Sequence, residues 1–182
     1  MGKLAYEVPE SKKVRYIIHT DCKNEADDQY TVAHCLMTPL LDIKGIIAAH
    51  FDKNFKGYPS GATTQASYDE IMTVLDAMDM NGKYPVKCGA TVPMVDEKTP
   101  VDSEGARLII EEAMKDDDRP LFIGLQGSIT DLASAILIEP KICDRMTAIW
   151  IGGGVYPKGG SEFNLSQDIA AANVVMKSSM PL

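Results

Sequence analysis

The sequence predicts an α/β fold, a doubly wound and mostly parallel β-sheet with helices on both faces. Short apolar runs that end in polar loops alternate with longer segments of helical spacing, which is the pattern of a parallel sheet covered by helices. With 182 residues and 45% hydrophobic content, the chain can bury one sizeable core. We therefore expect a single α/β domain over residues 1–182.

Two strands and two helices are expected before residue 81. Residues 14–18 form an apolar run that ends in an acidic loop, and residues 27–37 have helical spacing up to a nearby proline. Residues 43–49, IKGIIAA, form the second buried run. The loop that follows is rich in Gly and Pro, which exclude a long regular element, and helical spacing resumes at residues 63–80.

Three further strands and two helices are expected in the rest of the chain. Residues 83–88 form a short strand, and residues 103–115 form a helix with a Glu-rich exposed face. LFIGL at residues 121–125 is a strand that follows a charged turn. SITD at residues 128–131 resembles a capping box that opens the next helix. Residues 146–151 form the last apolar strand, which enters GGGVYPKGG.

Each expected strand leads into a loop on the same edge of the sheet. The loops are TDCKNEADD, HFDKNF, the segment after Cys88, QGSIT and GGGVYPKGGSEFN. Open α/β folds bind ligands outside the carboxyl ends of their strands, so polar groups from these distant loops can meet there. This edge is therefore the expected functional site.

The first of these loops holds three aspartates. Asp21 is separated by a short loop from Asp27 and Asp28, so the three side chains can converge on one hard cation through oxygen atoms alone. A structural interpretation stays open beside this metal hypothesis. Acids in a first helical turn commonly complement the helix dipole, and Asp21 has the residue type of a turn or capping residue.

Two other loops carry oxygen-rich groups. A carbonyl of the GLQGSITDLA turn, which includes Thr130, can serve as a neutral ligand for a hard cation. Taken in isolation, the segment is better explained as an ordinary strand-to-helix turn with a good cap. Glu162 and Asn164 occupy alternate positions and point the same way if the chain is extended there. A carboxylate and an amide suit the hydroxyl groups of a sugar, but surface polar residues often have this spacing by accident.

Three further features carry less information. The glycines at 152–154 match neither common phosphate-binding pattern, and they indicate a tight departure of the backbone from a strand near a ligand. His50 lies on the functional edge, where a ligand contact and a structural role are equally compatible with its position. Trp150, within an apolar run, is expected in the core.

Composition excludes several classes of function. The net charge is −8, and no Lys/Arg cluster alternates with aromatic residues, which argues against a nucleic-acid partner. No apolar run has the length of a membrane span or a secretion signal, so we expect a cytoplasmic protein without a membrane partner. The four cysteines form no CxxC pair and are expected to be reduced. Cys22 lies among carboxylates that disfavour its thiolate, so it is not a predicted nucleophile.

In their order along nearly the whole chain, four segments resemble the landmarks of the inosine-uridine preferring nucleoside hydrolase family. They are IIHTD…DDQYTVAHCL, IKGIIAAHF, LQGSITDLASAIL and IWIGGGVYPKGGSEFNLSQDIAA. The resemblance implies a Rossmann-like α/β fold, a tightly bound Ca²⁺ ion and hydrolysis of the N-glycosidic bond of a ribonucleoside, which releases base and ribose. It also implies a small-molecule nucleoside or ribosyl substrate and a homo-oligomer.

The resemblance also implies roles for individual residues. Asp21 matches the carboxylate that binds calcium and acts as the base on the attacking water. Asp28 matches a second calcium ligand, and Asp27 matches its neighbour that holds a ribose hydroxyl. Thr130 matches the residue whose backbone carbonyl binds the metal, and Glu-Phe-Asn at 162–164 matches the ribose-binding segment.

The acidic loop departs from the family pattern DTDxGxDD. His19 stands in place of the first Asp, the glycine is absent, and five residues rather than three separate Asp21 from Asp27. We therefore expect Asn24 and Glu25 to line the site, with Asn24 as a further substrate-binding residue.

Family members continue well beyond this length, and their later part supplies another calcium-binding aspartate and a histidine that helps the base leave. We therefore expect residues 1–182 to form the N-terminal part of a longer domain. The alternative is a non-catalytic ribose or carbohydrate-binding domain of the same fold. A third interpretation, a metal-dependent hydrolase of phosphates, fits Asp21 but lacks basic residues for the phosphate.

Overall fold

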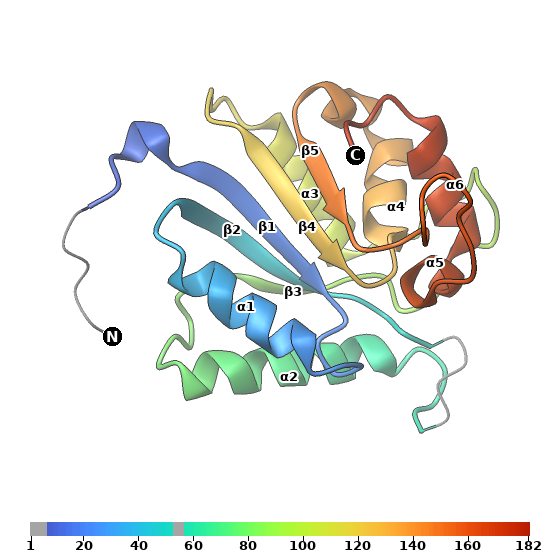
Figure 1. Cartoon of the computed structure of the whole chain (residues 1–182), viewed down its shortest axis with the longest axis horizontal. Helices are drawn as coiled ribbons and strands as arrows, with labels where there is room; N and C mark the ends of the chain where they lie inside the picture. The colour runs from blue at the N-terminus through green and yellow to red at the C-terminus, as the bar shows by residue number, and fades with distance from the viewer. Residues whose placement is uncertain (1–6, 53–56) are drawn as a thin grey trace.

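A five-stranded parallel sheet forms the centre of the protein, with the strand order β3-β2-β1-β4-β5 (Figure 1). The computed structural model describes residues 7–52 and 57–182. The strands are β1 (Val14–Thr20), β2 (Leu41–Ala48), β3 (Val86–Cys88), β4 (Leu121–Gln126) and β5 (Thr147–Trp150). The helices are α1 (Asp27–Met37), α2 (Thr63–Ala77), α3 (Glu104–Met114), α4 (Thr130–Ile138), α5 (Phe163–Gln167) and α6 (Ile169–Lys177). The predicted α/β class is confirmed.

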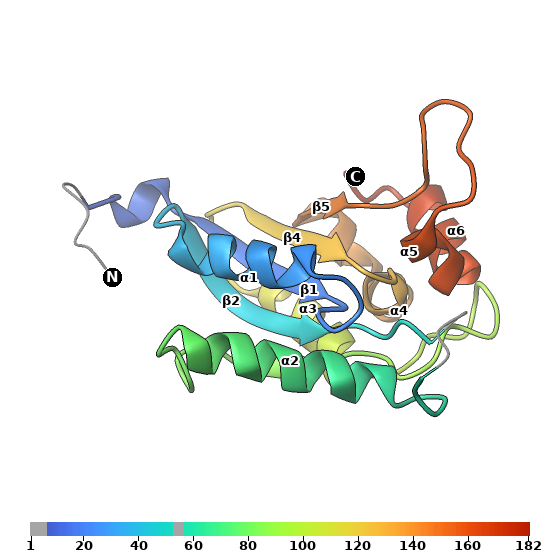
Figure 2. The ribbon, with the colours of Figure 1, turned by 60° about the horizontal axis from the view of Figure 1, so that its bottom comes forward.

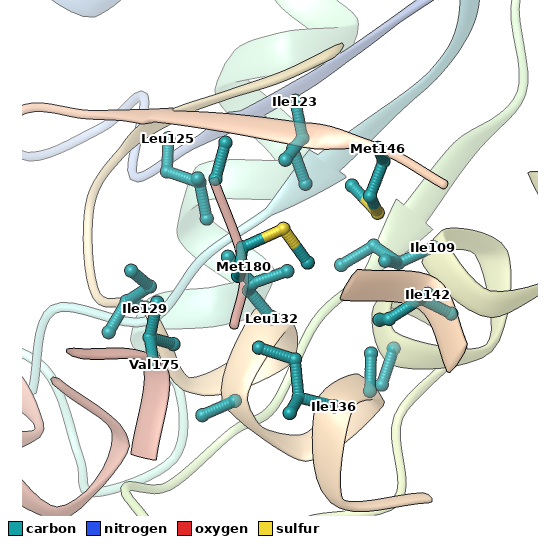
Figure 3. Packing of buried hydrophobic residues seen from close by; sticks show 14 of the residues in the cluster. Ile109, Ile123, Leu125, Ile129, Leu132, Ile136, Ile142, Met146, Val175 and Met180 are labelled. Atoms are coloured by element: carbon teal, nitrogen blue, oxygen red, sulfur yellow. The ribbon is translucent and has the colours of Figure 1, made fainter. Parts of the chain in front are cut away.

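Helices cover both faces of the sheet, and each face has its own core. Helices α1 and α2 lie on one side, while α3, α4 and α6 lie on the other (Figure 2). The neighbouring residues Ile17 and Ile18 of β1 point to opposite faces, as the alternation of a strand requires, and belong to different clusters. Leu132 and Ile136 of α4 point into the same cluster as Ile123 of β4 (Figure 3). This packing fixes the start of α4 relative to the end of β4.

The end of α2 and the start of β3 differ from the predicted boundaries. Helix α2 ends at Ala77 because Asp79 adopts a φ of 55°, and the N–H of Met80 then bonds the Leu75 carbonyl at 2.8 Å. This is a Schellman arrangement with aspartate in the position usually taken by glycine. The predicted strand at 83–88 is shortened to its last three residues.

The last strand is less buried than its apolar sequence predicts. Ile149 and Ile151 are 53% and 57% exposed. Both line a pocket together with Thr31 and Cys35 of α1. Helices α1 and α2 lie over the strands β1 to β3, so the sheet is left open at β5 on this face (Figures 1 and 2). Trp150 is half-buried rather than central to the core, and its indole N–H donates to the Gly127 carbonyl at 3.1 Å.

Candidate active site

The carboxyl ends of β1, β2 and β4 meet at one edge, and Asp21 lies between them. In the parallel register Thr20 is beside Ala48 of β2 and Gln126 of β4, so the loops after these three strands begin at the same level. A Cβ atom added at Gly127 would lie 3.1 Å from Asp21 Cγ. The QGSIT loop therefore runs directly against the Asp21 carboxylate, as expected for an edge that brings distant segments together.

Asp21 and Asp28 form a buried acidic pair. They are only 1% and 3% exposed. Burial raises the pKa of Asp21 from 3.8 to about 8, and the charge of Asp28 adds to this rise. Burial also raises the pKa of Asp28 to about 6, although the Thr20 hydroxyl donates to its carboxylate and acts in the opposite direction. Two neighbouring buried carboxylates whose pKa values are raised in this way are typical of a functional site.

The rest of the acidic loop is more open. Asp27 is exposed in the first turn of α1, where its position agrees with the dipole interpretation. Asn24 is half-buried and donates from Nδ2 to Asp21 Oδ2 at 3.3 Å. Glu25 is exposed. The structure thus brings Asn24 to Asp21 but leaves Asp27 and Glu25 at the surface.

His19 and Asp131 form a buried pair beneath this loop. His19 Nε2 lies 2.9 Å from Asp131 Oδ2, and both side chains are fully buried. Asp131 also accepts hydrogen bonds from the Ala90 N–H at 2.8 Å and the Ser103 hydroxyl at 2.5 Å. Burial acts to raise the pKa of Asp131, but these bonds hold it below its ordinary value. Asp131 is therefore a structural acid in the ionised form.

The predicted capping box is wrong because Asp131 is committed elsewhere. Ile129 occupies the N-cap position of α4, so no side-chain oxygen caps the helix. Within the described residues, the Ser128 hydroxyl is buried without a hydrogen-bond partner. Sequence reasoning missed the pairing of His19 with Asp131, since 112 residues separate them.

Thr130 is fully buried, and its hydroxyl joins two other loops. The hydroxyl donates to Asp168 Oδ2 at 2.7 Å, and His50 Nε2 lies 2.8 Å from the hydroxyl oxygen of Thr130. Burial lowers the pKa of His50, although nearby carboxylates act against this. Asp168 was not among the predicted residues. Its signal in the sequence is only its place four residues after Asn164, at the start of a helix.

Glu162 and Asn164 bind their own backbone. The Glu162 carboxylate accepts from the N–H groups of Asn164 at 2.9 Å and Leu165 at 2.8 Å, and so caps α5. It also accepts from the Gly153 N–H at 3.3 Å. Asn164 donates from Nδ2 to the Ile151 carbonyl at 3.0 Å. The condition of an extended chain holds for Glu162 but not for Asn164, which lies within α5, and both side chains lie at the carboxyl end of β5.

The comparisons with known proteins agree with this architecture. The sequence profile of the inosine-uridine preferring nucleoside hydrolase family matches residues 16–182. The chain belongs to this family. A protein of that name from Leishmania major is 33% identical over 87 residues, which cover 45% of this chain and 28% of that protein. The pyrimidine-specific ribonucleoside hydrolase RihA of Escherichia coli O1:K1 is 23% identical over 187 residues, which cover 89% of this chain and 57% of RihA.

The solved structure of an inosine-guanosine nucleoside hydrolase has the same fold. Its TM-score is 0.68 at 22% identity, over 91% of this chain and 59% of that one. A purine-preferring ribonucleoside hydrolase from Gardnerella vaginalis also scores 0.68, at 16% identity over 90% of this chain and 57% of that one. The chain thus spans less than two thirds of the length of these relatives. No helix in the parts described, 7–52 and 57–182, is both long and apolar enough to cross a membrane.

The donor set of this family member fits a hard cation incompletely. Asp21 and Asp28 supply buried carboxylate oxygens and Asn24 a nearby amide. A calcium ion takes about six to eight oxygen ligands, so backbone carbonyls and water would have to supply the others. Among the residues that the structure describes, no group of three or more His, Cys, Asp and Glu side chains is arranged to hold a metal. The side chain of Thr130 faces His50 and Asp168. Its backbone carbonyl is therefore the group of this residue that could serve as a metal ligand.

Proposed function

We propose that this nucleoside hydrolase family member takes part in hydrolysis of the N-glycosidic bond of ribonucleosides with a calcium ion at Asp21 and Asp28. The observation that carries the proposal is the buried acidic pair with raised pKa values at the carboxyl edge of the sheet. Since the pair is unfavourable when both acids are charged, a divalent cation between them would offset the repulsion. Thr130 would add its backbone carbonyl, and the family relationship supports that assignment.

In the proposed reaction, the oxygen of water adds to the anomeric carbon while the N-glycosidic bond breaks and its electron pair leaves on the base nitrogen. Calcium, when bound, would supply orientation of the sugar hydroxyls and polarisation of the water. The Asp21 carboxylate, which a bound cation would keep ionised, accepts the proton of the water. Its negative charge also stabilises the oxocarbenium-like sugar in the transition state. A proton from solvent completes the free base.

The sugar would be held at the same edge. Asn24, Asp27, Glu162 and Asn164 are the proposed contacts for ribose hydroxyls. Glu162 and Asn164 already use part of their hydrogen-bonding capacity on the backbone near β5, but each keeps an acceptor oxygen with capacity for a hydroxyl donor. Asp27 is exposed on the first turn of α1, so its carboxylate is open to a ligand.

A non-catalytic ribose-binding domain is the second candidate, because none of the three histidines is placed to protonate a leaving base. His19 and His50 are fully buried and paired with Asp131 and Thr130, so neither is free to protonate a leaving base. His34 lies in the last turn of α1, at the opposite end of that helix from Asp28. The hydrolase proposal therefore relies on solvent, or on a group outside these residues, for that step.

The test is an assay of inosine and uridine cleavage with the metal-stripped chain, with and without added calcium. Release of base that requires calcium and is lost in Asp21→Asn supports the hydrolase. The matched control is Asp76→Asn, since Asp76 lies near the far end of α2 and should not affect turnover. Calorimetric binding of ribose without release of base selects the binding domain. If the folded protein binds neither calcium nor ribose, both candidates are excluded.

A further inference from the structure

The side chain of Thr130 is held by two groups from different parts of the chain. His50 follows β2, and Asp168 is the N-cap of α6, and both reach the same hydroxyl oxygen at 2.8 and 2.7 Å. The sequence separations are 80 and 38 residues. A buried threonine at the start of a helix needs no such pairing for helix formation, because its position in the first turn is set by the packing of α4.

The hydrogen atoms of this group can be assigned by counting. The Thr130 hydroxyl has one proton and donates it to Asp168. His50 Nε2 must therefore carry a proton and donate it to the Thr130 oxygen. In the part of the chain that the structure describes, His50 Nδ1 is buried without a partner, which agrees with a neutral ring protonated at Nε2. The two hydrogen bonds therefore run in one direction: His50 donates to Thr130, and Thr130 donates to Asp168.

Asp168 connects these two hydrogen bonds to two more segments of the protein. Its Oδ2 atom also accepts the N–H of Met94 at 2.8 Å, and its Oδ1 atom accepts the N–H of Ala171 at 2.9 Å. The carboxylate is only 3% exposed, so these bonds are shielded from water. Asp168 also directly follows α5, the helix that Glu162 caps and that contains Asn164. One buried carboxylate therefore ties the start of α4 to the segment proposed to bind ribose.

We propose that His50 and Asp168 are positioning residues that hold Thr130 through its hydroxyl, so that its backbone is fixed for metal binding and in register with Glu162 and Asn164. This inference rests on the proposed function, because it uses the Thr130 carbonyl as a calcium ligand. It assigns a role to the side chain of Thr130, whereas the proposed calcium ligand is the backbone carbonyl of the same residue. Groups that orient metal ligands typically change metal affinity by about 10- to 100-fold when they are lost.

The test compares three variants by calorimetric titration of the metal-stripped chain with calcium chloride. Thr130→Val keeps the shape of the side chain but removes the hydroxyl, and we expect calcium affinity to fall by about 10- to 100-fold. Thr130→Ser keeps the hydroxyl and should retain an affinity close to that of the wild type. Ser134→Ala is the matched control on the same helix, because it removes another buried hydroxyl, the one that accepts from the Val101 N–H at 3.1 Å. It should lower thermal stability without a change in calcium affinity.

The outcomes separate the positioning role from the metal site itself. If Thr130→Val binds calcium as tightly as the wild type, the positioning role is refuted while the metal site stands. If the wild-type chain binds no calcium, the proposed metal site fails, and the positioning role fails with it. Should Thr130→Val not fold, Asp168→Asn provides the second test, since it keeps the size of the side chain but removes one acceptor. Wild-type calcium affinity in a folded Asp168→Asn variant would likewise overturn the inference.

Discussion

Replacement of Asp21 by asparagine should stabilise the metal-free protein at pH 7.5, although it removes the proposed catalytic base. The folded-state pKa of Asp21 is about 8, against an ordinary value of 3.8. The folded protein therefore holds the proton more tightly than the unfolded chain does. The contribution of Asp21 to the free energy of unfolding is therefore greatest below about pH 4 and falls as the pH rises towards 8.

The magnitude follows from the pKa difference. Each tenfold change in acid dissociation is worth about 1.4 kcal/mol, so a rise from 3.8 to about 8 corresponds to about 5 kcal/mol at pH 7.5. Water penetration and relaxation around the carboxylate reduce this value, and we expect Asp21→Asn to gain about 3 kcal/mol. Asparagine has nearly the same shape but carries no charge, so the gain isolates the electrostatic cost of the acid.

Urea unfolding of the metal-stripped proteins, followed by circular dichroism, measures the difference. At pH 4 the advantage of Asp21→Asn should nearly vanish, because the wild-type carboxyl is then mostly protonated. Calcium at pH 7.5 should raise the free energy of unfolding of the wild type but not that of the variant. Asp131→Asn is the control, since the pKa of this buried acid is lowered and its loss should destabilise the protein at pH 7.5. An Asp21→Asn variant that is no more stable than the metal-free wild type at pH 7.5 would refute the reasoning.

Three further predictions concern the edge of the sheet. Gly127→Ala places a Cβ atom 3.1 Å from Asp21 Cγ, so it should cost about 1–3 kcal/mol of thermal stability and weaken calcium binding in the same titration. His19→Leu leaves the buried Asp131 without its imidazole donor and should lower the free energy of unfolding by about 3–5 kcal/mol. A loss below 1 kcal/mol would show that this pair is not needed to hold the loop. Glu162→Gln weakens the cap of α5, so ribose affinity should fall while the melting temperature changes little.

Sequence reasoning predicted the frame of the fold well because each element carries its own local pattern. The helix at residues 27–37 was predicted with its observed bounds, and the strands at 14–18 and 121–125 differ from the structure by one or two residues. It missed α5 and α6 because the glycine-rich approach to Glu162 indicates a loop. The start of α5 depends on a capping bond from Glu162, which is a local contact that the pattern of apolar residues does not reveal.

The candidate site was predicted only in part, for a different reason. Asp21 and Asp28 come together because both flank the same turn, which the sequence displays directly. The pairings of His19 with Asp131 and of Thr130 with His50 and Asp168 depend on loops that meet only in the folded sheet. No spacing in the sequence reports such contacts.

The buried acids at this edge differ in how well the fold satisfies them, and the difference separates structural from functional groups. Asp131 accepts from an imidazole, a hydroxyl and a backbone N–H, and Asp168 accepts from a hydroxyl and two backbone N–H groups. Within residues 7–52 and 57–182, Asp21 accepts the long bond from Asn24 and a backbone hydrogen bond, and Asp28 accepts from the Thr20 hydroxyl. The fold gives Asp131 and Asp168 three donors each and leaves Asp21 and Asp28 with less support for their charge. This difference supports the proposal that Asp21 and Asp28 bind a ligand that stabilises their charge. That contrast within one edge favours a cation at Asp21 and Asp28 more strongly than acidity alone, which the first turn of any helix can explain.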